Sequence, residues 1–122
     1  MTVALTETPF VDTIAGNDIV IVDWWASWCG PCRMFAPIFE AASARHDYRV
    51  CAKIDTEAEQ ALAASAGIIS IPMLMVFRDQ VLVFSQPGAL PAAALEDLIA
   101  KVRDLDMDEV RRTVAAQASA EV

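Results

Sequence analysis

Two cysteines with two residues between them are the side chains of this sequence with the clearest chemical potential. Cys29 and Cys32 flank Gly30-Pro31, directly after a short apolar run. If a helix begins here, this spacing brings both sulfurs within bonding reach across one turn. The free N–H groups and the dipole at a helix N-terminus stabilise an anion, and the thiolate is the form of cysteine that attacks a disulfide. The spacing therefore predicts dithiol–disulfide exchange, with the Cys29 sulfur at the exposed tip and Cys32 one turn inside.

Half of a zinc site is the alternative interpretation of the cysteine pair. A structural zinc ion needs four ligands, and the rest of the chain offers only Cys51 and His46 as soft candidates. We therefore expect no metal. Cys51 lies in an alternating segment and is expected to be a small buried hydrophobic side chain, with a regulatory or dimer-forming thiol as the alternative. His46 is expected on the surface near a helix C-terminus, where a cation complements the helix dipole.

Length and composition exclude several classes of protein. A chain of 122 residues with 56% hydrophobic residues argues for one globular domain. Nine Lys and Arg against seventeen Asp and Glu give a net charge of −8, which disfavours nucleic acid and anionic membrane surfaces as partners. No apolar run is long enough to span a membrane, and no secretory signal is visible. Three cysteines, an odd number, fit reactive thiols in a reducing compartment, so we expect a cytoplasmic protein.

A strand followed by a helix must position the two cysteines. Residues 19–26 are β-branched and aromatic, which predicts a buried strand. Apolar residues recur at helical spacing over 31–46 and predict a helix there. Pro31 suits the first turn of this helix, whereas Pro37 should kink it.

The remaining pattern predicts a mixed sheet. An Ala-rich segment ending at Gly67 indicates a helix with a C-terminal cap. A gap of three residues between the last two strands allows only an antiparallel hairpin. The further elements expected are strands near 3–5, at 49–54, 73–77 and 81–84, a helix capped by Thr8 with Pro9 at its first position, a helix over 57–66 and a last helix from Pro91. Together they predict an α/β domain with helices on both faces of the sheet.

Three segments of the chain resemble the thioredoxin family. Residues 22–32, which end in Trp-Cys-Gly-Pro-Cys, resemble its active-site segment, Ile71-Pro72 resembles its cis-proline loop, and Gly88-Ala89 resembles its last loop. The resemblance covers roughly residues 3–103. It implies the thioredoxin fold, a central mixed β-sheet flanked by helices on both faces, over residues 1–104. Residues 105–122 are then a C-terminal extension, which we expect to form a short helix or a mobile tail.

The resemblance also implies a role for each matching residue. Cys29 would attack a client disulfide, and Cys32 would resolve the mixed disulfide. Asp23, an ionisable residue in an apolar strand, should have a raised pKa and exchange a proton with Cys32, while Lys53 tunes this carboxyl. Pro72 should be cis, face the cysteines and leave nearby backbone groups free to pair with an extended substrate.

The substrate-contact patch and the departures from the family pattern lie close together. The patch implied around Cys29 consists of Trp28, Gly30, Pro31, Ile71 and Gly88. Met73 and Pro87 depart from the usual residues beside this patch and could change the choice of partner. Gln80 replaces the usual hairpin glycine, so that this turn must differ or carry strain.

The function implied is that of a cytoplasmic, monomeric protein-disulfide reductase that serves as an electron carrier. Thioredoxin reductase would supply electrons from NADPH, disulfide-containing client proteins would receive them, and the chain itself would hold no cofactor beyond its redox-active disulfide. A thiol oxidase or isomerase of the same fold is one alternative. A binding module whose partners need the fold and not the redox chemistry is another.

Overall fold

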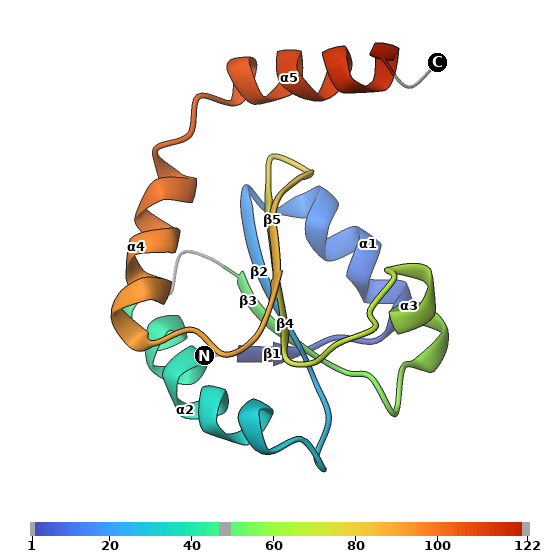
Figure 1. Ribbon diagram of the computed structural model, residues 1–122, viewed down its shortest axis with the longest axis vertical. Coiled ribbons are helices and arrows are strands. Elements are labelled where there is room, and N and C mark those ends of the chain that lie inside the picture. The colour runs from blue at the N-terminus through green and yellow to red at the C-terminus, as the bar shows by residue number, and fades with distance from the viewer. Residues whose placement is uncertain (1, 47–49, 121–122) are drawn as a thin grey trace.

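The computed structural model describes residues 2–46 and 50–120, which form five strands and five helices (Figure 1). In chain order these are β1 (Thr2–Ala4), α1 (Glu7–Gly16), β2 (Ile19–Trp25), α2 (Gly30–Arg45), β3 (Val50–Asp55), α3 (Gln60–Ser65), β4 (Met73–Arg78), β5 (Val81–Pro87), α4 (Ala92–Arg103) and α5 (Met107–Ala120). Arg49, expected to start the third of these strands, lies outside the described residues.

The strands form one mixed sheet in the order β1-β3-β2-β4-β5. β3 runs parallel to β1 and β2, whereas β4 is antiparallel to both of its neighbours. The central strand β2 is buried over most of its length, which agrees with its continuous apolar sequence. The predicted α/β class and the antiparallel hairpin are therefore confirmed.

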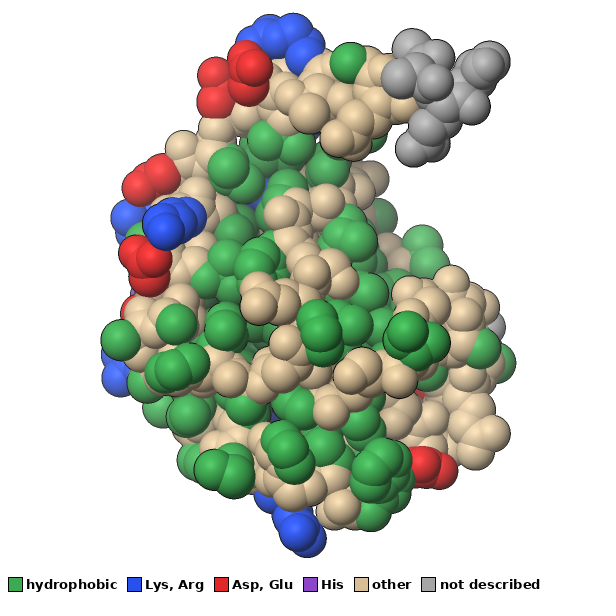
Figure 2. Space-filling model, viewed as in Figure 1, with side chains coloured by type: hydrophobic (Ala, Val, Ile, Leu, Met, Phe, Trp, Pro, Cys, Tyr) green, Lys and Arg blue, Asp and Glu red, His purple; other side chains and the backbone are tan. Residues whose placement is uncertain are grey.

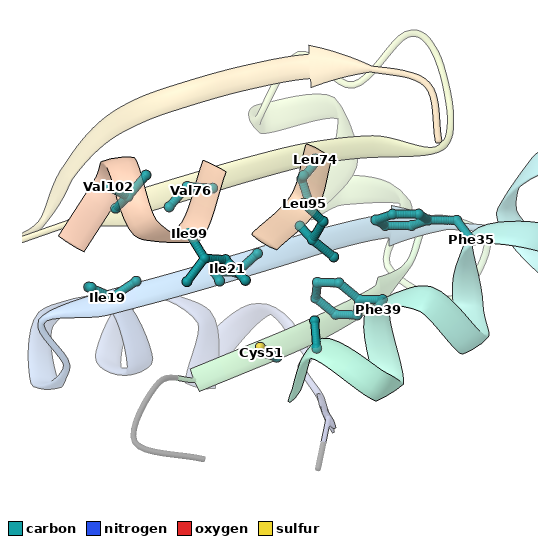
Figure 3. Close-up of a cluster of buried hydrophobic side chains, with 11 residues drawn as sticks. Ile19, Ile21, Phe35, Phe39, Cys51, Leu74, Val76, Leu95, Ile99 and Val102 are labelled. Carbon is teal, nitrogen blue, oxygen red and sulfur yellow. The ribbon is translucent and has the colours of Figure 1, made fainter. Parts of the chain in front are cut away.

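Successive side chains of β2 point to opposite faces of the sheet and divide the core into two clusters. Ile19 and Ile21 face α2 and α4, and Val20, Val22 and Trp24 face the opposite side, which carries α1 and α3. The cluster on the α2 and α4 side is drawn in Figure 3 and also contains Phe35, Phe39, Cys51, Leu74, Val76, Leu95, Ile99 and Val102. Helices thus cover both faces of the sheet, as predicted.

Three helix starts differ from the expected ones. The N-cap of α1 is Thr6 and not Thr8, because the Thr6 carbonyl already accepts the N–H of Phe10 at 3.2 Å. α3 begins at Gln60 and not at residue 57. The reason is that Asp55 Oδ1 accepts the N–H groups of Glu57 and Ala58. These two hydrogen bonds hold the residues before Gln60 in a turn.

The helix expected from Pro91 starts one residue later. Pro91 has extended backbone and is the N-cap of α4, and its carbonyl accepts the N–H of Leu95 at 3.0 Å. Because proline lacks an N–H, this position at the start of the helix costs no hydrogen bond.

The turn between β4 and β5 holds two non-glycine residues in the left-handed region. Asp79 has a φ of 50° and Gln80 a φ of 71°. A two-residue hairpin turn of type I′ requires a positive φ at both of these positions. The Asp79 N–H donates to the Asp18 carbonyl at 2.7 Å, which ties the turn to the start of β2. The expected strain at Gln80 is therefore present.

α5 extends the chain beyond the sheet and lies past the tip of the β4–β5 hairpin (Figure 1). Asp106 Oδ1 accepts the N–H groups of Asp108 and Glu109 at 3.1 and 3.3 Å, so the Asp106 side chain caps the start of α5. Arg78 Nη1 donates to the carbonyls of Val102 and Arg103 at 2.6 and 3.0 Å and so links the hairpin to the last turn of α4, just before α5. Of the two expectations for the C-terminal extension, a short helix or a mobile tail, the structure shows the helix, which runs up to residue 120.

Within residues 2–46 and 50–120, no helix combines the length and the apolar character needed to cross a bilayer.

Candidate active site

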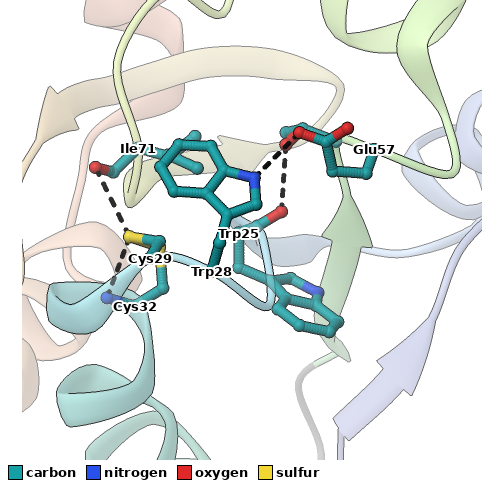
Figure 4. Close-up of a disulfide and its surroundings, with 7 residues drawn as sticks. Trp25, Trp28, Cys29, Cys32, Glu57 and Ile71 are labelled. Atoms are coloured by element: carbon teal, nitrogen blue, oxygen red, sulfur yellow. Dashed lines mark hydrogen bonds between the residues drawn. A yellow bond between two sulfur atoms is a disulfide. The ribbon is translucent and has the colours of Figure 1, made fainter.

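The two cysteines lie at the start of α2, shortly after the end of β2, and they form a disulfide (Figure 4). Their Cα atoms are 5.2 Å apart. Cys29 is the N-cap of α2, and the Cys32 N–H donates to its Sγ at 3.2 Å. The predicted helix start, with proline in the first turn, is confirmed. In the reduced protein the same N–H and the helix dipole would act on a negatively charged Cys29 sulfur.

Both cysteines are buried, which corrects the expectation of an exposed Cys29 sulfur. Cys29 is 4% exposed and Cys32 is 2% exposed. They pack with Ala26 in a small cluster that Trp25 and Ile71 complete. The active-site loop is folded against the cis-proline loop, and this contact could not be read from helix geometry alone.

Asp23 and Lys53 lie side by side on the face of the sheet that α2 covers. The two residues are register partners in the parallel strands β2 and β3. Asp23 is 1% exposed, and neither of its carboxyl oxygens has a hydrogen-bond partner. Burial raises the pKa of the Asp23 carboxyl to about 6, and the positive charge of Lys53 partly opposes this rise. The predicted buried carboxyl with a raised pKa is thus present, with Lys53 as the charge that tunes it.

Lys53 also contacts an aromatic ring of the active-site segment. Its Nζ lies 5.0 Å from the ring centroid of Trp25, within the range of a cation–π interaction. Lys53 and Trp25 line a cavity of about 450 Å³ together with the residues Thr2, Ala4, Leu5, Thr6, Asp55, Ala58 and Glu59. Trp25 thus contacts both Lys53 and the cluster around the disulfide.

The cis-proline loop lies directly beside the disulfide. The Ile71–Pro72 peptide bond is cis, as expected. The Ile71 carbonyl oxygen lies 3.9 Å from Cys29 Sγ. The Pro72 carbonyl accepts the N–H of Gly88 at 2.8 Å. Gly88 has a φ of 104°, a conformation that favours glycine.

Trp28 stands out from the surface next to the disulfide. The residue is 65% exposed, and its Nε1 donates to Glu57 Oε1 at 2.8 Å. Figure 4 shows the indole lying between the disulfide, Ile71 and Glu57. Glu57 is a residue that sequence reasoning missed, since only the tertiary fold brings the two side chains together.

The two departures from the family pattern near the site face each other. Met73 and Pro87 are register partners at the site end of β4 and β5. The Ser85 hydroxyl donates to Met73 Sδ at 3.7 Å, so Met73 is held against the hairpin. Both departures lie beside the cis-proline loop, as the sequence indicated.

Cys51 and His46, the two residues considered as further zinc ligands, lie in different parts of the fold. Cys51 is buried in the core cluster of Figure 3, as the small hydrophobic interpretation predicted. His46 is the C-cap of α2 and pairs with Glu96 of α4, which also pairs with Arg45. The pKa of Glu96 is lowered by these contacts, chiefly by the hydrogen bond from His46. His46 thus links the two helices that cover one face of the sheet.

A dithiol pair at a helix N-terminus, a buried carboxyl behind it and a cis-proline beside it define the class of thiol–disulfide oxidoreductases built on this sheet. The model of the thioredoxin family matches residues 1–101, so the chain belongs to that family. It carries out dithiol–disulfide exchange as a protein-disulfide oxidoreductase.

Similar proteins share the fold and most of the length. A putative thioredoxin 2 of Streptomyces coelicolor is 53% identical over 116 residues, which covers 95% of this chain and 87% of that protein. Thioredoxin of Porphyra purpurea is 38% identical, covering 80% of this chain and 92% of that protein. A mutant thioredoxin of Halobacterium salinarum superimposes with a TM-score of 0.78 at 34% identity over 85% of this chain and 92% of that one. The Streptomyces alignment is long enough that it must include most of α5.

Proposed function

We propose that this chain reduces disulfides of client proteins, with Cys29 as the attacking thiol and Cys32 as the resolving thiol. The observation that carries the proposal is the position of Cys29 as N-cap of α2, with the Cys32 N–H 3.2 Å from its sulfur. A thiolate in that position is stabilised and is the nucleophilic form.

The electron balance follows from two exchanges. The Cys29 thiolate attacks one client sulfur, the client S–S bond breaks, and one client thiolate leaves while a mixed disulfide forms. Cys32 then loses its proton and attacks Cys29 Sγ, which breaks the mixed disulfide and releases the second client thiolate. The client gains two electrons, and the chain ends with the Cys29–Cys32 disulfide. Because both thiols belong to one chain, the second step is intramolecular and fast.

Asp23 is proposed to take the proton that Cys32 loses. With a pKa of about 6, its carboxyl is mostly ionised at neutral pH and can accept a proton in a site from which water is largely excluded. Lys53, its register partner, keeps that pKa from rising further.

The electrons are proposed to come from NADPH through thioredoxin reductase, and the chain itself needs no bound cofactor. The family supports a reductase as the general kind of partner. A reductase role fits a compartment that keeps thiols reduced, so the cytoplasm is the proposed location, with the chain acting as a monomeric electron carrier.

An insulin-disulfide reduction assay with thioredoxin reductase and NADPH tests the proposal. The wild-type chain should accelerate reduction, Cys29→Ser should abolish it, and Cys51→Ala should retain it as a matched control. Cys32→Ser should accumulate a mixed disulfide through Cys29. A wild-type chain that does not accelerate reduction would refute the proposal, and formation of disulfides in reduced clients would instead favour the oxidase. A biological role retained by the Cys29→Ala, Cys32→Ala protein would favour the binding module.

A further inference from the structure

The two edges of the sheet differ in length and composition. β1, at one edge, is three residues long, whereas β5, at the other, is seven residues long and holds no charged side chain. An edge strand exposes N–H and C=O groups to which a further strand can add, and native proteins block such edges with charges, proline, bulges or short strands. In β5 a register shift lies opposite Val76 and Phe77, and Pro87 ends the strand. The stretch from Phe84 to Gln86 between them is open to strand addition.

A groove lies between this stretch of β5 and α4. Its volume is about 320 Å³, and its apolar lining includes Phe84, Leu90 and Leu98. The two charged residues that line it, Asp97 and Lys101, form an ion pair with each other at 2.9 Å, so the groove carries no net charge. Figure 2 shows hydrophobic side chains gathered over the middle of this face, whereas charged side chains lie along α4 and at the start of α5. An uncharged segment with an apolar side chain therefore fits this groove.

The groove begins close to the active site. The Ile71 carbonyl lies 3.9 Å from Cys29 Sγ, and the next carbonyl, that of Pro72, accepts the N–H of Gly88 at 2.8 Å. Gly88 directly follows β5. Because neighbouring Cα atoms are about 3.8 Å apart, the path from Cys29 Sγ through these residues to Gln86 is at most about 20 Å long. An extended client advances about 3.3 Å per residue, so about six residues bridge the disulfide and the groove.

We propose that β5 and this groove bind a second segment of a client protein, an extended, uncharged stretch about six residues from the cysteine that Cys29 attacks. The backbone of this segment pairs with the edge of β5 between Phe84 and Gln86, and one of its apolar side chains enters the groove. The inference rests on the proposed function. Because the segment and the cysteine belong to one chain, binding of the segment raises the effective concentration of the client disulfide at Cys29.

Charge favours a client over a second copy of this chain as the occupant. Two copies carry a net charge of −8 each and repel one another. The position of the groove, within reach of Cys29, likewise points to the molecule that reacts there. A client segment is therefore the occupant to which both observations point.

The test follows single-turnover disulfide exchange between the reduced full-length chain and two peptide disulfides of equal length. About six residues from its cysteine, one peptide carries alternating leucine and threonine, and the other carries alternating glycine and serine. The half-saturating concentration should be about tenfold lower for the leucine–threonine peptide, which corresponds to about 1.4 kcal/mol. The maximal rate should be the same for both peptides, because the segment binds away from the reacting sulfurs.

Two variants on α4 separate the groove from its surroundings. Ala94 is exposed and lines the groove, whereas Ala93 is exposed and does not line it. Ala94→Glu places a carboxylate in the groove and should remove the difference between the peptides. Ala93→Glu adds the same charge at the neighbouring position and should retain the difference. A leucine–threonine peptide that is N-methylated throughout this segment cannot pair as a strand and should lose its advantage.

Four results would overturn the inference. Equal half-saturating concentrations for the two peptides would mean that clients do not use the groove, and equal effects of Ala93→Glu and Ala94→Glu would mean that charge alone acts. An advantage that survives N-methylation would refute strand addition to β5. A wild-type dimer in sedimentation that Ala94→Glu dissociates, with no preference between the peptides, would assign the groove to a second copy. Failure of the wild type to react with either peptide would instead refute the proposed function itself, which separates that failure from the others.

Discussion

Replacing Asp23 by asparagine should make the protein more stable at neutral pH. The carboxyl is buried without a hydrogen-bond partner, and its pKa rises from 3.8 to about 6 on folding. The folded state therefore binds more protons than the unfolded state between these two pH values, and stability falls as pH rises through that window. At about 1.4 kcal/mol per pKa unit, ionised Asp23 costs about 3 kcal/mol above pH 6, and this cost is absent below pH 3.8.

The assay is urea unfolding of the oxidised wild type and of Asp23→Asn across this pH range. Using the oxidised protein keeps Cys29 and Cys32 from titrating. The difference in unfolding free energy between the two proteins should shift by about 3 kcal/mol in favour of the asparagine variant as pH rises from 3.8 to above 6, and then remain flat. A difference that is constant with pH, or that shifts in favour of the wild type, would refute the assignment of Asp23 as a desolvated carboxyl.

Three further predictions test single contacts. Lys53→Met removes the charge that lowers the pKa of Asp23, so a carbon-13 titration of this carboxyl should show ionisation at higher pH, and an unchanged or lower midpoint would contradict the coupling. Gln80→Gly should stabilise the protein by about 1 kcal/mol in urea unfolding, because the left-handed φ of 71° costs glycine little, and a loss of stability would contradict this. Arg78→Met removes donors from the carbonyls before α5 and should cost about 2 kcal/mol, with faster amide exchange in α5, whereas unchanged exchange would show that α5 is held by other contacts.

Patterns local to the chain predicted most of the fold. The apolar run of β2, the helical spacing of α2 and the short gap in the hairpin each depend on residues close in sequence, and all three elements are present. Helix starts were less predictable, because a turn formed by Asp55 shortens α3 and because α1 begins after Thr6, whose side chain makes no capping hydrogen bond.

The residues of the candidate site that belong to a short sequence motif could be predicted. The cysteine pair, the carboxyl in an apolar strand and the proline before β4 could be read directly. The burial of Cys29, the contact of Trp28 with Glu57 and the use of the Pro72 carbonyl by Gly88 all join segments far apart in sequence. No local pattern encodes such contacts.

The most direct test of the central claim is the pH dependence of Cys29 alkylation in the reduced protein, followed by mass spectrometry. The control is a peptide of residues 27–33, which is too short to form a stable helix. If the start of α2 stabilises the thiolate, Cys29 should reach half of its maximal rate at a lower pH in the protein than in the peptide. An equal or higher midpoint in the protein would contradict the claim that the fold activates this sulfur.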